Sequence, residues 1–336
     1  MNRLFVFVPV LLGALWSVSC SKSLIDNAQV EAIRPLVEQV EQQRLMDFVV
    51  EVTNVRKSKE EQPLDCALLG RSPNSSLCSL TRKLSGEILQ RRFESAGLRI
   101  SHQTGGTEPL TTSNIIAELP GVTHPEEIIL VGAHYDAVYQ GADDNTSGTA
   151  AMVEMARILS QYKFDRTIRF VGFDLEELGL IGSLRYADTI KGERIYSSIV
   201  FDGIGYYDFT PGSQRSMPGL PTPEAGDFLT VIADELSHPR AAELFTLNER
   251  LGLMKVVPIL VPRDGTFTMG GALQRSDHSS LWAVGHPAMF LTDTANFRNP
   301  HYHRPTDTVD TLHPEMFRKA VQVSLAAVAL WAGGPR

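Results

Sequence analysis

Basic residues are the minority charge in this chain of 336 residues, which has 31 lysines and arginines against 39 aspartates and glutamates, for a formal net charge of −8. The lysines and arginines also form no concentrated cluster along the sequence. A nucleic-acid or anionic-membrane surface requires such a cluster, so neither is expected as a partner. The hydrophobic fraction of 43% and the charged fraction of 21% are ordinary for a globular protein. We therefore expect a folded core and a small or peptidic substrate.

Long apolar runs are also absent. The apolar run at residues 4–18 follows Arg3 and is interrupted by Pro9 and Gly13. It is shorter than the roughly 20 residues that a membrane-spanning helix needs, and it is typical of a secretory signal. We predict that residues 1–20 are a signal peptide and that the protein is exported.

The end of this signal contains one of only three cysteines. Cys20 follows Val18 and Ser19, which resembles the processing site of bacterial lipoproteins, where the cysteine becomes the lipidated first residue. Ser17 departs from that pattern, which usually has leucine there, and cleavage of an ordinary signal is the alternative. Ser21 resembles the sorting pattern for the outer membrane. The resemblance implies a lipid anchor at Cys20 on the periplasmic face of that membrane, whereas ordinary cleavage implies a periplasmic or secreted protein.

The other two cysteines, Cys66 and Cys78, flank a loop-like segment. Export to an oxidising compartment favours a disulfide between them. By loop-closure reasoning such a bridge contributes about 3 kcal/mol, so its role would be structural. Two buried free thiols are the alternative.

The first part of the mature chain is predicted to be helical. Apolar residues recur at three- and four-residue spacings across 27–55, and a second helix is predicted over 79–96, with Gly97 as its stop. Neither segment concentrates polar side chains that could bind a ligand. We expect residues 27–97 to be a helical packing segment.

After Gly97 the chain alternates between strand-like and helical patterns. The strand-like runs are 98–100, 113–119, 127–131, 167–173, 197–201 and 288–292, and the helical stretches are 146–162, 183–190, 228–233 onward and 314–332. Such alternation predicts an α/β fold with a mixed, mostly parallel central sheet and helices on both faces. Residues 208–226 and 262–276 are predicted loops, and 21–336 is predicted to form a single domain.

Histidines and carboxylates follow several of the strand-like runs. These candidates are His134, Asp136, Glu176, Glu177, Asp202 and His303. The carboxyl ends of parallel strands meet at one edge of a sheet, so we expect these side chains to lie together. Imidazole nitrogen and carboxylate oxygen form a zinc-type ligand set that needs no thiolate. The sequence thus predicts a metal site at this edge.

Six short motifs, in order, resemble the co-catalytic dizinc aminopeptidases of peptidase family M28. They are Ala-His-Tyr-Asp at 133–136, Gly-Ala-Asp-Asp-Asn-Thr-Ser-Gly at 141–148, Asp-Leu-Glu-Glu-Leu-Gly-Leu-Ile-Gly-Ser at 174–183, Phe-Asp at 201–202, Ser-Asp-His at 276–278 and Tyr-His-Arg-Pro-Thr-Asp-Thr at 302–308. The similarity covers about residues 95–332. It implies the zinc exopeptidase fold and an aminopeptidase that acts on peptides with a free N-terminus.

The same resemblance implies a role for each candidate residue. Two zinc ions are implied, with His134 and Asp202 as ligands of one ion, Glu177 and His303 as ligands of the other, and Asp143 bridging both. Glu176 would be the catalytic general base. The peptide bond between Asp143 and Asp144 is expected to be cis, as in the family.

Asp136 has a separate expected role. It lies two residues beyond His134, so in an extended segment its carboxylate could accept the second ring N–H and fix the tautomer of the histidine.

Some assignments have alternatives within the sequence. His301 competes with His303 as the last ligand, because the two lie on the same side of an extended segment. Asp143 and Asp144 could be turn and helix-cap residues, and Asp144 is expected to take that role. Asp277 and His278 are expected either to support the site or to have a local structural role.

Other functions also remain open. Carboxypeptidases and aminoacyl hydrolases of the same family are close rivals. Glutaminyl cyclases resemble the family but use one zinc ion, with Asp-Ser where this chain has Asp143-Asp144-Asn145 and with a longer insertion after the glutamate pair. A non-enzymatic binding protein is disfavoured, because every implied ligand position and the base are filled.

Overall fold

The structure is a computed structural model that describes residues 25–57, 79–107, 110–216, 222–261 and 270–336. The predicted signal peptide with Cys20, and both Cys66 and Cys78, lie outside these residues, so the anchor and the disulfide stay predictions. Among the helices described, none is both long and apolar enough to span a membrane.

The described strands form one eight-stranded sheet in the order β1-β2-β4-β3-β5-β8-β6-β7. Their bounds are β1 Arg99–Gly105, β2 Thr112–Leu119, β3 His124–His134, β4 Arg166–Phe173, β5 Arg194–Phe201, β6 Leu229–Asp234, β7 Val256–Val261 and β8 Met289–Thr292. The four central strands β4, β3, β5 and β8 run parallel. Antiparallel pairs join β1 to β2, β2 to β4, and β6 to β8. The predicted mixed, mostly parallel sheet is confirmed.

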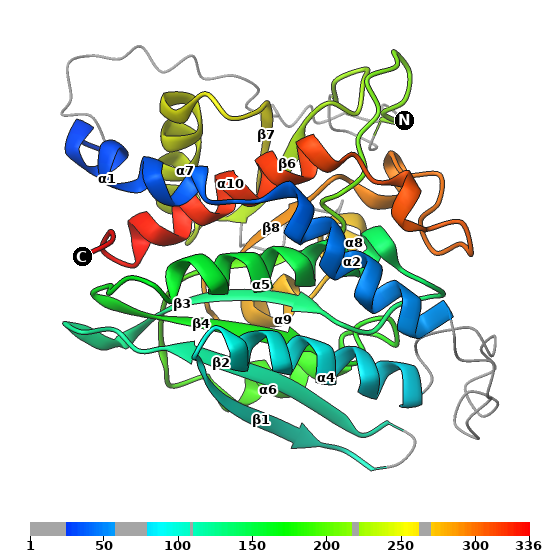
Figure 1. Cartoon of the computed structure of the whole chain (residues 1–336), viewed down its shortest axis with the longest axis horizontal. Helices are drawn as coiled ribbons and strands as arrows, with labels where there is room; N and C mark the ends of the chain where they lie inside the picture. The colour runs from blue at the N-terminus through cyan, green and yellow to red at the C-terminus, as the bar shows by residue number, and fades with distance from the viewer. Residues whose placement is uncertain (1–24, 58–78, 108–109, 217–221, 262–269) are drawn as a thin grey trace, which may run out of the picture.

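Helices cover both faces of this sheet, because alternate side chains of the central strands are apolar on each side. On β3, Ile129, Val131 and Ala133 belong to the core under one helical layer, while Ile128 and Leu130 belong to the core on the opposite face. The larger layer contains α1 Asn27–Glu38, α2 Gln42–Lys57, α4 Ser79–Ser95, α5 Gly148–Leu159, α7 His238–Leu251 and α10 Pro314–Trp331. On the other face lie α6 Ile181–Thr189 and α9 His278–Ala283, seen behind the sheet in Figure 1.

The predicted helix over 27–55 is two helices, α1 and α2, separated by a short break. Side chains of α5 bind two backbone groups at the break, since the Glu41 N–H donates to Glu154 Oε1 at 3.0 Å and Arg157 Nη2 donates to the Gln39 carbonyl at 2.8 Å. The predicted helix over 79–96 is confirmed as α4, and Gly97 follows it with φ +76°.

The helix predicted from residue 228 is wrong, because residues 229–234 form strand β6 and the next helix, α7, begins only at His238. Every residue of β6 is buried, so the run has no polar alternation that could distinguish a strand from a helical turn. Strand β7, which pairs with β6, was not predicted at all.

The remaining described elements are short and lie in the connections. They are the irregular turn η1 Ala142–Ser147, helix α8 Gly270–Leu273 and the single turns η2 Ala295–Phe297 and η3 Val309–Thr311. Turn η1 leads directly into α5, which covers the centre of the sheet. It therefore places its own side chains at the carboxyl end of β3.

Candidate metal centre

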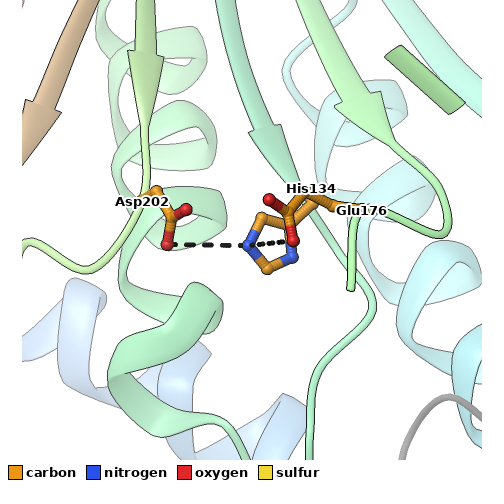
Figure 2. Close-up of side chains that lie close together, drawn as sticks. All are labelled: His134, Glu176 and Asp202. Atoms are coloured by element: carbon orange, nitrogen blue, oxygen red, sulfur yellow. Dashed lines mark ion pairs between the residues drawn. The ribbon is translucent and has the colours of Figure 1, made fainter. Parts of the chain in front are cut away.

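The carboxyl ends of the parallel strands bring the predicted residues together. His134 is the last residue of β3, Asp202 follows the end of β5, and Glu176 comes shortly after β4. Figure 2 shows the carboxylates of Asp202 and Glu176 beside the imidazole of His134, and both dashed lines end on the same ring nitrogen. His134 Nε2 lies 3.7 Å from Asp202 Oδ1 and 3.8 Å from Glu176 Oε2. Segments distant in sequence thus meet at one edge of the sheet, as expected.

Two groups of potential ligands lie side by side. In each group the nitrogen and oxygen atoms are within 4.8 Å of one another, and the groups are His134, Glu176 and Asp202, then Asp144, Glu177 and His303. In the second group, His303 Nε2 is 2.9 Å from Glu177 Oε2. Both groups combine one imidazole with carboxylates, the donor set that suits zinc.

Asp144 belongs to the second group but also faces the first. Its Oδ1 is 3.3 Å from His134 Nε2, and its Oδ2 is 3.1 Å from His303 Nε2, so each oxygen faces one histidine. This corrects the prediction that Asp143 bridges. The Asp143 carboxylate is instead bound elsewhere, by the Gly205 N–H at 2.8 Å and by Asn299 Nδ2 at 2.7 Å.

The physical reason is the backbone of turn η1. Asp144 has φ −101° and ψ 97°, which is outside the helical range, so the two successive carboxylates point in different directions. The cis peptide bond is also one residue later than predicted, between Asp144 and Asn145. Asn145 is held in place by its side chain, which donates from Nδ2 to the Phe201 carbonyl at 2.8 Å.

Asp307 supports this turn and was given no role from the sequence. Its two oxygens accept the N–H groups of Asp143 and Asp144 at 2.9 and 3.1 Å. The available signal was its position in the 302–308 motif, four residues after His303. Its carboxylate links the loop that carries His303 to the turn that carries Asp144.

Asp136 acts on the glutamate pair as much as on His134. The ring Nδ1 of His134 is 3.0 Å from the backbone carbonyl of Asp136 and 3.5 Å from its carboxylate. The carboxylate accepts the N–H groups of Glu176 and Glu177 at 3.1 and 3.2 Å. The carbonyl contact favours a proton on Nδ1, which leaves Nε2 free to bind a metal.

Unsatisfied polar atoms indicate that this centre takes a cation. His134 Nε2 and Asp144 Oδ1 are buried, and neither makes a hydrogen bond with the described residues. Buried polar atoms are normally satisfied, so orphaned atoms facing each other call for a ligand. A zinc ion bound by nitrogen and oxygen fits these donors.

The electrostatics of the centre support the same conclusion. Burial alone would lower the pKa of His134, but Glu176 and the surrounding carboxylates raise it well above its ordinary value. Burial raises the pKa of Glu176 well above its usual range, with repulsion from Asp202 adding to the shift, and it raises that of Glu177 to about 7. Divalent cations would neutralise these crowded carboxylates.

Of the two competing histidines, only His303 belongs to a ligand group. His301 Nδ1 instead lies 3.0 Å from Thr306 Oγ1. His278 is a buried structural residue that stacks on Phe290, with Nε2 2.8 Å from the Leu273 carbonyl.

A small cavity adjoins Asp202 and has a mixed lining. The lining includes Ile232 and Phe290, the hydroxyl groups of Thr230 and Thr292, and Tyr302 from the loop that carries His303. Asp202 is the residue that this cavity shares with the ligand groups.

The sequence matches known proteins over most of its length. The family model described as Peptidase family M28 matches residues 114–328. The uncharacterized protein YfbL of Escherichia coli is 31% identical over 73% of this chain and 78% of its own length. Aminopeptidase YwaD of Bacillus subtilis is 30% identical over 74% and 50%, and the probable lipoprotein aminopeptidase LpqL of Mycobacterium tuberculosis is 27% identical over 68% and 47%. The chain spans about half the length of these two aminopeptidases.

Solved structures share the fold. LapA of Legionella pneumophila has a TM-score of 0.66 at 19% identity, covering 92% of this chain and 77% of LapA. BSAP, a zinc aminopeptidase from Bacillus subtilis, has a TM-score of 0.52 at 27% identity, covering 67% and 52%. A glutaminyl cyclase from Fimbriiglobus ruber has a TM-score of 0.59 at 17% identity, covering 86% and 95%. LapA and the cyclase are too distant in sequence to indicate more than the fold.

Proposed function

Because the chain belongs to peptidase family M28, we propose that it is a zinc-dependent aminopeptidase, which hydrolyses the first peptide bond of peptides with a free N-terminus. The observation that carries this proposal is the position of Asp144, with one carboxylate oxygen facing the histidine of each ligand group. A carboxylate shared in this way suits a two-metal site. The names of YwaD and BSAP support both the activity and the metal.

We assign the zinc ligands by group. His134 and Asp202 would hold one ion, Glu177 and His303 would hold the other, and Asp144 would be shared by both. When bound, zinc supplies a Lewis acid that polarises the scissile carbonyl and makes water more acidic. The assignment requires two ions per chain, which metal analysis can count.

Glu176 is the proposed general base. Its N–H is held by Asp136, and its carboxylate lies at the edge of the first group, 3.8 Å from His134 Nε2. From there it can accept a proton from the attacking water and pass it to the departing amine. Burial raises the pKa of Glu176, which makes this carboxylate a stronger base than an exposed glutamate.

The cavity beside Asp202, about 40 Å³ in volume, is the proposed place for a small side chain of the first substrate residue. Its Ile232 and Phe290 side chains offer apolar contact, and Thr230 and Thr292 add hydroxyl groups. A substrate bound there would have its first residue close to Asp202 of the first ligand group.

Export is also part of the proposal. LpqL, whose name describes it as a probable lipoprotein aminopeptidase, is similar to this chain. The apolar run at 4–18 is typical of a secretory signal peptide. A lipid on Cys20 is tested by the mass of the N-terminal peptide of the mature protein. An unmodified N-terminus beyond Cys20 would contradict the lipid and leave export intact.

One experiment tests the function directly. Zinc content per chain is measured together with hydrolysis of free and N-acetylated aminoacyl reporters. Two zinc ions and a requirement for the free amine are expected. One zinc ion and ammonia release from N-terminal glutaminyl peptides would favour a cyclase instead, and cleavage at the C-terminus would favour a carboxypeptidase.

The general base is tested by Glu176→Gln, which keeps the shape of the side chain but removes its basicity. We expect kcat to fall by about 10²–10⁴-fold, the usual contribution of a general base, while both zinc ions remain bound. Retention of full activity would exclude Glu176 from this role.

A further inference from the structure

Arg56 is a buried arginine that reaches the metal centre from a helix outside the family match. It lies in the last turn of α2 and is only 2% exposed. The family model begins at residue 114, so no motif assigns Arg56 a role. Arginine is rarely buried this completely without a specific partner. Its contacts therefore indicate what it does.

The guanidinium binds both ends of the segment that separates two proposed ligands. Nη2 donates to the Tyr135 carbonyl at 2.8 Å, directly after His134. Nη1 donates to the carbonyls of Gln140 at 2.7 Å and Gly141 at 3.2 Å, shortly before Asp144. One rigid group thus sets the distance between the two ends of this segment.

The segment needs such a partner, because it has no regular backbone structure of its own. Residues 135–141 form neither helix nor strand, and Tyr139 and Gly141 have φ values of 61° and 56°. Buried carbonyl oxygens outside helices and strands must find donors elsewhere. A Cβ on Gly141 would lie 2.3 Å from the Cβ of Ala137 and 3.0 Å from Arg56 Nη1. The backbone at Gly141 therefore passes close to both Ala137 and the guanidinium.

Arg56 also contacts the chain on the far side of Asp144. Nη1 donates to Thr146 Oγ1 at 2.8 Å, and that hydroxyl donates to the Gly141 carbonyl at 2.5 Å. Resting on the assignment of Asp144 as shared zinc ligand, we propose that Arg56 is a positioning residue that holds segment 135–146 so that Asp144 lies between the two ligand groups.

The charge of Arg56 fits this role. Burial lowers its pKa to about 10, and the carboxylates of Asp136, Asp307 and Asp144 act against that shift, so the group stays cationic at neutral pH. The buried cation therefore lies close to carboxylates of opposite charge on the segment that it binds and on Asp307, and the attraction adds to its hydrogen bonds.

The test compares three variants of the full chain. Arg56→Met removes the charge and all hydrogen-bond donors at a similar side-chain length. Arg56→Lys keeps the charge but loses the planar guanidinium with its several N–H donors, called the fork below. Ser85→Ala is the matched control. The control removes the Arg56 Nε bond to Ser85 Oγ of α4, 3.2 Å long, which does not touch the segment. Zinc affinity is measured by competition with a chromophoric chelator, and kcat and KM with an aminoacyl reporter.

We expect Arg56→Met to lower zinc affinity and kcat by about 10–100-fold, the range seen when partners that orient metal ligands are removed. KM should change little, Arg56→Lys should recover part of the loss, and Ser85→Ala should stay near wild type. Unchanged zinc affinity and kcat in folded Arg56→Met would overturn the proposal, as would an equal loss in Ser85→Ala.

If Arg56→Met does not fold, Arg56→Lys decides. If Arg56→Lys has the zinc affinity and kcat of wild type, the guanidinium fork has no positioning role. A drop in both quantities would support the proposed role. The chelator assay separates this proposal from the function. A wild-type protein that binds zinc but leaves every aminoacyl reporter intact would refute the aminopeptidase, while the effect of Arg56 on zinc affinity would still be measured.

Discussion

The two ligand groups are built on different foundations. The first group comes from strand ends, with a His134 side chain that is 0% exposed and an Asp202 that directly follows β5. The second depends on loops, since His303 is 37% exposed, has φ 56° and stacks on Tyr302 at 3.9 Å between ring centroids. The comparison indicates that the sheet fixes one half of the centre, while bonds between loops fix the other.

Asp144 joins the two halves, so changing it should have the largest effect among the ligand variants. We expect Asp144→Asn to reduce zinc content and to lower activity by more than about 100-fold, beyond the loss caused by residues that only orient ligands. The matched control is Asp143→Asn, whose carboxylate contacts neither group and which should retain both ions. Metal analysis after dialysis gives the answer. The opposite ranking of the two variants would restore Asp143 as the bridge.

The difference in exposure between the two histidines predicts different responses to added imidazole. His134→Ala and His303→Ala should both lose more than about 100-fold in activity, as expected for direct ligands. Imidazole should restore part of the activity of His303→Ala, because the lost side chain was partly exposed, but not of His134→Ala. Reporter hydrolysis across an imidazole titration measures this. If imidazole rescued both variants equally, the two ligand groups would not differ in their access to solvent as proposed.

A smaller effect is expected on stability after zinc is chelated. The folded pKa is raised to about 7 for Glu177 and to about 10 for His303. A raised folded pKa contributes stability below the unfolded pKa and loses it as pH rises through the folded value. The thermal midpoint of the chelated protein should therefore fall between pH 5 and pH 9, while zinc binding strengthens as its ligands lose protons.

The measurement is a pair of thermal melts, with zinc and with chelator, at each pH. The gap between the two midpoints should widen as pH rises, and Glu177→Gln should show a shallower slope in chelator. If the difference between the two midpoints narrowed as pH rises, the result would contradict the stability effect assigned to the raised pKa values of Glu177 and His303.

Much of this centre could be predicted from the sequence, because strand ends are readable from apolar runs. His134, Asp202 and the glutamate pair each follow such a run, and their convergence required only that the strands be parallel. The prediction that Asp143, and not Asp144, is the shared ligand was wrong. Which of the two carboxylates faces both histidines depends on the dihedral angles of turn η1, and the spacing of residues in the sequence does not reveal those angles.

Arg56 and strand β6 were missed for different reasons. Arg56 acts on the backbone of a distant segment, and backbone carbonyls carry no sequence signal that could pair with an arginine in a helix. Strand β6 is buried on both faces, so its pattern resembles that of a buried helical turn. In both cases the structure depends on contacts with distant parts of the chain, which the local sequence pattern does not show.

The place of β8 in the sheet has a consequence for how the protein is made. Among the described strands, β8 is the last in the chain, yet it lies between β5 and β6 and is the neighbour that joins them. Until residues 289–292 are in place, the pair β6–β7 has no partner that connects it to the rest of the sheet. The sheet is therefore completed only after nearly the whole chain is available, and until then its open strand edges can pair with other chains.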